Sequence, residues 1–218
     1  MRKVFYITIL SLIFCGITLA DFARDVELAR RYVALNKYED ARKILEPNLL
    51  THPDDPTLKI LLKQVYRALK DNAALLSLIE DDLLRNPNDA HTWMEAGDLH
   101  LSLGNLTEAK KAFDTATKLS PKDEGLTLSI FNSYRTWGFT DEGIALLTGA
   151  RKESDNPAAY AMEIASMYEI RGDWNSAADE YAIYLKQYPD RFGDVEQRLN
   201  EVAVDKSQLA ELERAVES

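Results

Sequence analysis

The sequence predicts an all-α superhelical solenoid built from five helical hairpins of 34 residues each. Three observations support this fold class. Residues 22–191 divide into five consecutive blocks of equal length without an insertion, small residues recur at fixed places in the blocks, and apolar residues recur at steps of three and four. One such hairpin cannot bury its apolar face alone, so stacking on its neighbours must complete the core.

The N-terminal residues 1–20 are typical of a secretory signal peptide. Arg2 and Lys3 give a positive start, a 17-residue, mostly apolar run extends from Val4 to Ala20, and Ala20 is small enough for a peptidase site. We therefore expect cleavage after Ala20 and export to the periplasm or the medium. The alternative is an uncleaved membrane anchor, although 17 residues are at the short limit for spanning a bilayer.

Cys15 is the only cysteine of the chain, and Phe14 precedes it. A bacterial lipoprotein site requires a small residue at that place, so we do not expect lipidation. The mature chain then has no cysteine and cannot form a disulfide. Core packing alone must hold the fold in an oxidising compartment.

The mature chain is acidic. Loss of Arg2 and Lys3 leaves 24 basic and 36 acidic residues, a formal charge of −12. Such a chain repels polyphosphate, so nucleic acid and anionic membrane surfaces are excluded as expected partners. Membrane attachment is expected only through an uncleaved signal anchor.

The third block carries a complete motif. Its residues at block positions 4, 8, 11, 15, 20, 24, 27 and 32 are Trp93, Gly97, His100, Gly104, Ala109, Phe113, Ala116 and Pro121. This pattern resembles the tetratricopeptide repeat, which implies two antiparallel helices per block and a scaffold that binds other proteins. The resemblance covers the blocks 22–55, 56–89, 90–123, 124–157 and 158–191.

The other blocks follow the motif with different fidelity. The second has Lys63 and Leu75 where small residues are expected, and the fourth has Gly143 at position 20 and Asp155 in place of the proline. Positions 8 and 20 are where the paired helices of this family approach most closely. The resemblance therefore implies close contacts between Ala29 and Ala41, Gly97 and Ala109, and Ala165 and Ala177.

Residues 192–218 are expected to form two C-terminal capping helices. Asp194 can cap the first, which carries Val195, Leu199 and Val202 on one face, and the second is marked by Leu209, Leu212 and Val216. A truncated sixth repeat or a second surface for oligomerisation is the alternative.

No constellation in the sequence points to catalysis, a metal or a cofactor. His52, His91 and His100 lack the spacing that puts two ligands on one helix face, and the glycines are single turn markers. The 27 residues after the last block are too few for a catalytic domain. We therefore expect a protein that is not an enzyme. The three tryptophans, Trp93, Trp137 and Trp174, are interpreted as core or turn packing.

The expected binding surface lies on the first helix of each block. Positions 5, 9 and 12 share one side of that helix, opposite the core positions 4, 7, 8 and 11. We call this side the groove face, because it lines the concave groove in proteins with this repeat. Its expected partner-binding residues are Val26, Arg30, Ile60, Gln64, Arg67, Met94, Asp98, Leu128, Asn132, Arg135 and Met162.

An apolar row at position 5 with polar neighbours suits a helical or extended apolar segment of a partner protein. Packing of position 5 against the next repeat is the alternative. No block has lysine at position 5, so the carboxylate clamp of some related proteins is not expected. Binding of a glycan or small ligand is the second hypothesis, but positions 2, 5, 9, 12 and 13 hold no aromatic platform. The expected role is that of an exported bacterial adaptor in a secretion, pilus or polysaccharide-export complex.

Overall fold

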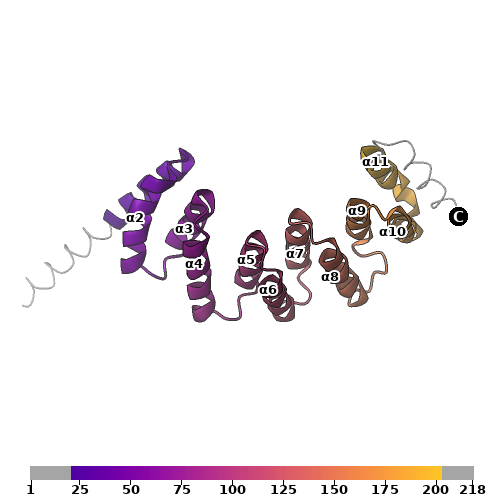
Figure 1. The fold of residues 1–218 in the computed structure, drawn as a ribbon, viewed down its shortest axis with the longest axis horizontal. Coiled ribbons are helices and arrows are strands. Elements are labelled where there is room, and N and C mark those ends of the chain that lie inside the picture. The colour runs from indigo at the N-terminus through magenta and orange to yellow at the C-terminus, as the bar shows by residue number, and fades with distance from the viewer. Residues whose placement is uncertain (1–20, 203–218) are drawn as a thin grey trace, which may run out of the picture. The chain divides into compact units, whose positions relative to one another are not determined.

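The computed structural model describes residues 21–202, and these residues form helices with no strand. The prediction of an all-α fold made of helical hairpins is confirmed (Figure 1). A first helix covers residues 21–34 of the described chain. It is followed by α2 (Tyr38–Thr51), α3 (Pro56–Leu69), α4 (Asn72–Arg85), α5 (Ala90–Ser102), α6 (Leu106–Leu119), α7 (Glu124–Thr136), α8 (Thr140–Lys152), α9 (Ala161–Arg171), α10 (Trp174–Gln187), a 3-10 turn η1 (Pro189–Arg191) and α11 (Phe192–Val202).

The described chain consists of two compact units, which divide between Pro87 and Asn88. The N-terminal unit contains residues 21–87 and the C-terminal unit contains residues 88–202. Each is treated by itself below. The expected signal peptide, Cys15 and the second capping helix with Leu209 lie outside the described residues.

Aspartates fix where many of the helices begin. The Asp55 carboxylate accepts a hydrogen bond from the backbone N–H of Leu58 at 2.9 Å, and that of Asp123 accepts one from Leu126 at the same distance. Such an N-cap satisfies a backbone donor that the helix itself leaves unpaired. The same arrangement is made by Asp71 at α4, Asp89 at α5 and Asp173 at α10.

The turn inside each hairpin has one geometry that recurs every 34 residues. Position 15 adopts the left-handed backbone conformation in all five blocks, and the following N–H donates to the carbonyl of position 11 at 2.8 to 2.9 Å. Glycine occupies this position in three blocks, where it carries no steric cost. The five left-handed residues are Asn36, Lys70, Gly104, Gly138 and Gly172.

The N-terminal unit has an aliphatic core, to which Leu45, Leu62 and Ile79 contribute fully buried side chains. Lys63 stands where the repeat motif expects a small residue, and its ammonium group lies 2.8 Å from the Asp82 carboxylate. An ion pair between α3 and α4 thus takes the place of the close backbone contact expected there.

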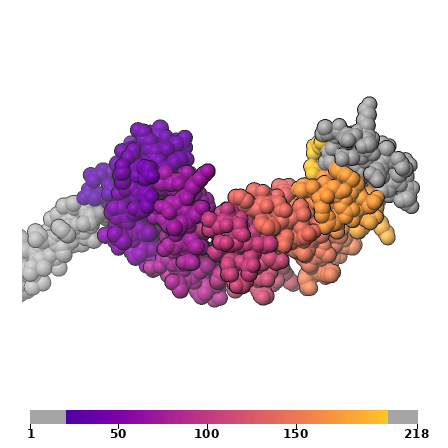
Figure 2. Space-filling view, in the orientation of Figure 1, coloured from indigo at the N-terminus to yellow at the C-terminus, as the bar shows by residue number. Residues whose placement is uncertain are grey.

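In the C-terminal unit, α5 to α10 form three hairpins (Figure 1). The space-filling view shows that atoms of successive hairpins pack against one another (Figure 2). One apolar cluster extends from Ala90 to Met167 and includes Phe113, Ile130 and Leu147. Gly97 is buried against the ring of Phe113, and Gly143 is buried against the methyl group of Met167. The glycine at position 20 of the fourth block therefore makes room for a side chain of the next helix pair.

The connection between α8 and α9 differs from the others. Asp155 replaces the proline, and α9 begins at Ala161, whereas α3, α5 and α7 begin at the first residue of their blocks. Tyr160 has a φ of +60°, an uncommon backbone conformation for a bulky residue. The Arg151 guanidinium holds this connection to α8, because it donates a hydrogen bond to the Ala159 carbonyl at 2.8 Å.

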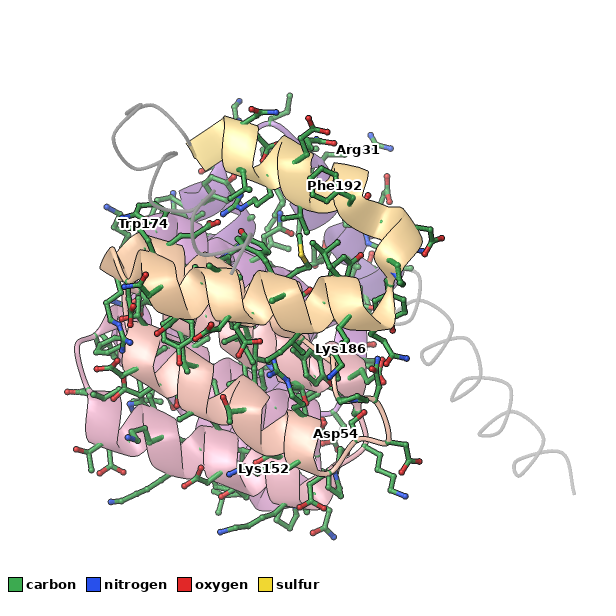
Figure 3. All side chains as sticks on the ribbon, turned by 90° about the vertical axis from the view of Figure 1, so that its right-hand side faces the viewer. Arg31, Asp54, Lys152, Trp174, Lys186 and Phe192 are labelled. Atoms are coloured by element: carbon green, nitrogen blue, oxygen red, sulfur yellow. The ribbon has the colours of Figure 1, made fainter. Side chains whose placement is uncertain are left out.

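The helix α11 covers the last hairpin (Figure 3). Val195 is 1% exposed and packs in a cluster with Ala165, Ala177 and Tyr181. The helix begins at Phe192, so Asp194 lies inside its first turn and does not cap it as expected. Its carboxylate instead accepts a hydrogen bond from the Tyr184 hydroxyl at 3.0 Å.

Among residues 21–202, no helix is both long enough and apolar enough to cross a bilayer.

Candidate functional site

The groove face of the N-terminal unit is open to solvent. Ile60 on α3 is 66% exposed, and Gln64 and Arg67 follow it on the same side of the helix and are also exposed. On the preceding helix Val26 is half-buried and Arg30 is exposed. All five predicted residues of this unit are therefore accessible to some degree.

In the C-terminal unit the apolar side chains of the groove face are less exposed than Ile60 is in the N-terminal unit. Met94 on α5, Leu128 on α7 and Met162 on α9 are each half-buried. Met94 packs on the large apolar cluster of this unit, and Met162 packs on the cluster that includes Val195. These two methionines therefore contribute both to internal packing and to the surface.

A tryptophan that sequence reasoning assigned to packing lies beside this face. Trp137, at the C-terminal end of α7, is 44% exposed, and its indole N–H donates to the Asp98 carboxylate on α5 at 3.4 Å. This hydrogen bond links the end of α7 to α5, which are the first helices of two successive blocks. Trp137 occupies block position 14, which is not one of the groove-face positions, so the repeat pattern does not predict its exposure.

The polar side chains expected beside Leu128 are exposed. Asn132 and Arg135 lie on the same side of α7 and face solvent. The Arg135 guanidinium lies 5.7 Å from the centre of the buried Phe131 ring, a cation–π contact that orients the charged end of its side chain. Leu128, Asn132, Arg135 and Trp137 thus form a mixed apolar and polar surface on one helix.

On the groove face of α9, α11 covers position 12, whereas Met162 at position 5 is half-buried. Glu169, at block position 12, has a side chain that is only 3% exposed, and its carboxylate accepts hydrogen bonds from the Arg198 Nε at 3.1 Å and Nη2 at 2.7 Å. The Tyr181 hydroxyl donates to the same carboxylate, and burial first, then this carboxylate, raises the pKa of Tyr181. This helix therefore offers no open surface at positions 9 and 12.

A pocket of about 470 Å³ lies at the start of α9, between the 153–160 connection and the end of α10. Tyr160, Tyr184 and Tyr188 line it together with Met162 and Glu163. The sequence-based search of the groove positions missed it, because its tyrosines come from a connection and from a second helix. The irregular repeat boundary at Asp155 was the available signal.

The described residues hold no group of three histidine, cysteine, aspartate or glutamate side chains that could bind a metal ion. His91 lies 3.8 Å from the Asp123 carboxylate at the surface, and His52 stacks on Phe22 with ring centres 4.1 Å apart. His91 and His52 thus have surface or packing contacts.

Two segments of the chain match models of the tetratricopeptide repeat. These are residues 90–123, which contain α5 and α6, and residues 162–191, which contain most of α9 and all of α10. Tetratricopeptide repeats are therefore present in the C-terminal unit. A search of curated proteins by sequence found no match.

Solved structures of similar fold include tetratricopeptide-repeat proteins and a pilus biogenesis factor. A repeat protein from Thermus thermophilus is 22% identical, with a TM-score of 0.50 over 84% of this chain and 100% of that chain. One from Parabacteroides merdae is 17% identical, with a TM-score of 0.54 over 90% and 84% of the two chains. PilW, a widely conserved type IV pilus biogenesis factor, is 17% identical, with a TM-score of 0.53 over 88% and 90%. At these identities the likeness shows the fold.

Proposed function

We propose that this chain is a non-catalytic scaffold that holds a protein partner on the groove face of its first helices. The observation that carries the proposal is the surface formed by Leu128, Asn132, Arg135 and Trp137 on α7. Trp137 is 44% exposed, and tryptophan and arginine are among the residue types most enriched where protein interfaces gain their binding energy. The polar neighbours supply hydrogen bonds that fix the register of a bound segment.

The proposal includes the chemistry of the partner segment. The half-buried Met94, Leu128 and Met162 of the C-terminal unit suit an apolar segment, helical or extended, with polar residues at its edges. In the N-terminal unit, considered by itself, the exposed Ile60 offers an apolar contact of the same kind. Methionine side chains adapt their shape to different apolar surfaces. No glycan, nucleic acid, metal or cofactor is required by this role.

We further propose that the scaffold is exported and works in the cell envelope. Support comes from the N-terminal sequence of residues 1–20 and from the acidic balance of the mature chain. The likeness to PilW, which is named as a pilus biogenesis factor, favours a role in assembling a secretion, pilus or polysaccharide-export complex.

Site-specific photo-crosslinking tests the binding surface. A photoreactive amino acid at Asn132, which is exposed on the groove face of α7, should crosslink to a discrete protein in intact cells. The same group at Lys118, exposed on the second helix α6, is the matched control and should not capture that protein. Adding Trp137→Ala should reduce the Asn132 product by about tenfold or more, because truncating an anchor of this kind costs 2 kcal/mol or more, by a rough estimate.

The circular dichroism spectrum of the Trp137→Ala protein should remain helical, which separates lost binding from lost folding. Equal capture from Asn132 and Lys118, or capture from Asn132 that Trp137→Ala leaves unchanged, would contradict the assignment to the groove face. Fractionation of cells that produce the full-length chain tests the location. Retention in the cytoplasm with the N-terminal residues intact would overturn the proposed export.

A further inference from the structure

The pocket at the start of α9 has a chemistry that the scaffold role does not use. Its volume of about 470 Å³ is in the usual range for a small-ligand site. Three tyrosines, Tyr160, Tyr184 and Tyr188, line it, and the rings of Tyr184 and Tyr188 have centres 5.2 Å apart at an angle of 52°. Two glutamates, Glu124 and Glu163, also line it.

The tyrosines are held in place by the surrounding structure. Tyr188 accepts a hydrogen bond at its hydroxyl from the Asn156 side chain at 3.0 Å, and Tyr184 donates one to Asp194 at 3.0 Å. Tyr160 occupies a strained backbone conformation that its surroundings maintain. Arg151, which donates to the carbonyl of the preceding residue Ala159, forms an ion pair with the Glu180 carboxylate at 2.6 Å. The pocket is therefore built before a ligand arrives, which lowers the entropic cost of binding.

The charges of the pocket favour a cation. Among residues 21–202, no basic side chain lies within ion-pairing distance of the Glu124 or Glu163 carboxylate. Both glutamates line the pocket together with Tyr160. The pKa of the Tyr160 hydroxyl is raised by burial first and then by the negative charges of these two glutamates. The basic residue in the lining, Arg191, is already engaged, since it lies 3.6 Å from Asp194 and 6.0 Å from the centre of the Tyr188 ring.

We propose that this pocket receives a lysine or arginine side chain of the partner protein. The faces of aromatic rings carry partial negative charge and attract ammonium and guanidinium groups. The two glutamates, which have no basic partner among residues 21–202, would neutralise such a group, and Met162 would contact the aliphatic part of the side chain. Met162 is also a residue of the groove face, so a segment bound there can place one basic residue in the pocket. This inference rests on the proposed scaffold function and adds a specificity-determining contact to it.

A titration of the mature chain, followed by two-dimensional amide NMR at low ionic strength, tests the proposal. The probes are the acetylated and amidated pentapeptides Gly-Gly-Lys-Gly-Gly and Gly-Gly-Arg-Gly-Gly. A norleucine pentapeptide is the neutral analogue, and cellobiose is a neutral sugar. The lysine and arginine peptides should cause saturable shifts at residues 158–163 and at Tyr188, whereas norleucine and cellobiose should not.

The double variant Glu124→Gln and Glu163→Gln removes both charges and keeps the side-chain shapes. It should raise the dissociation constant of the basic peptides by about fivefold, which corresponds to a loss of about 1 kcal/mol of binding free energy. The control is Asp179→Asn with Glu196→Gln, which removes two exposed charges at other places on α10 and α11. The control should bind as the unmodified chain does.

Several results would overturn the inference. Equal shifts from norleucine would make the pocket an apolar site, and shifts from cellobiose alone would make it a neutral sugar site. Equal loss of binding in the two double variants would show that the basic peptides respond to the overall negative charge of the protein and not to Glu124 and Glu163. The scaffold function is tested separately: if crosslinking at Asn132 fails while the basic peptides still bind, the scaffold fails and the pocket remains. If crosslinking persists unchanged in Glu124→Gln with Glu163→Gln, the pocket fails and the scaffold remains.

Discussion

The aromatic ring of Phe113 on α6 packs directly on the Cα atom of Gly97 on α5, in the space that any larger side chain at position 97 would occupy. The ring is 2% exposed and cannot turn away without displacing its neighbours. We predict that Gly97→Ala lowers the free energy of unfolding by about 1–3 kcal/mol, the usual cost of overpacking. Guanidinium denaturation followed by circular dichroism measures the change.

Gly149→Ala is the matched control for this prediction. Gly149 is also inside a helix, but it is exposed on α8 and an added methyl group there meets no atom within 4 Å. The substitution should stabilise the protein by about 0.5–1 kcal/mol, because alanine has the higher helix propensity. Equal effects at Gly97 and Gly149 would contradict the packing described for α5 and α6.

Lys70 is predicted to be a site where glycine is better than the native residue. Its φ of +57° lies in the left-handed region, and its side chain is exposed. Glycine removes the steric cost of the left-handed conformation, and this gain in free energy is larger than the cost of the extra conformational freedom that glycine gives the unfolded chain. Lys70→Gly should therefore stabilise the protein by about 0.5–1 kcal/mol. The reverse change at an equivalent turn, Gly104→Ala, should destabilise it by about 1 kcal/mol. Denaturant midpoints that move in the opposite directions would refute the turn geometry.

The contact between Arg198 and Glu169 predicts how α11 is held. In Arg198→Gln the Glu169 carboxylate stays buried but loses its cation, which should cost about 2 kcal/mol. Amide hydrogen exchange should then be faster throughout α11 than in α7. Arg191→Gln is the comparison: Arg191 and its partner Asp194 are largely exposed, so its effect should stay below about 0.5 kcal/mol. Unchanged exchange in α11 would count against the contact.

Asp89 predicts a dependence of stability on pH. Burial acts to raise its pKa, but hydrogen bonds from the Thr92 hydroxyl and from the backbone N–H groups of Thr92 and His91 outweigh burial, so the pKa is lowered from 3.8. The stabilisation is therefore complete above pH 3.8 and is lost as the pH falls through the pKa of the folded state. Asp89→Asn keeps a cap oxygen that does not titrate. The stability advantage of the unmodified chain over Asp89→Asn, measured by denaturation from pH 6 downward, should shrink below about pH 4; a constant difference would argue against the lowered pKa.

Much of the fold was predictable because the repeat imposes the same local rules many times. The glycines at the turns and the small residues at Gly97 and Ala165 identify hairpins, since few other arrangements use such residues at these spacings. Lys63 was the exception, because a lysine at a small-residue position gave no hint that Asp82 would pair with it. The ion pair between Lys63 and Asp82 depends on how α3 and α4 pack together, which the repeat pattern does not specify.

The candidate site was less predictable than the fold. The helical period correctly grouped Leu128, Asn132 and Arg135 on one side of a helix, because that grouping depends on geometry within one element. Trp137 and Tyr160 depend on how successive elements meet. The exposure of Trp137 follows from the packing of α7 against α5, and the pocket at Tyr160 follows from an irregular connection that the repeat period does not describe.

The buried Glu169 also limits how this protein can be lengthened or recombined. A helix that follows residue 191 must bring a cation to the place of Arg198, since otherwise it would trap an uncompensated negative charge. Grafting a standard repeat onto this end would therefore require an arginine at the seventh residue of its first helix, or the replacement of Glu169 by an uncharged residue.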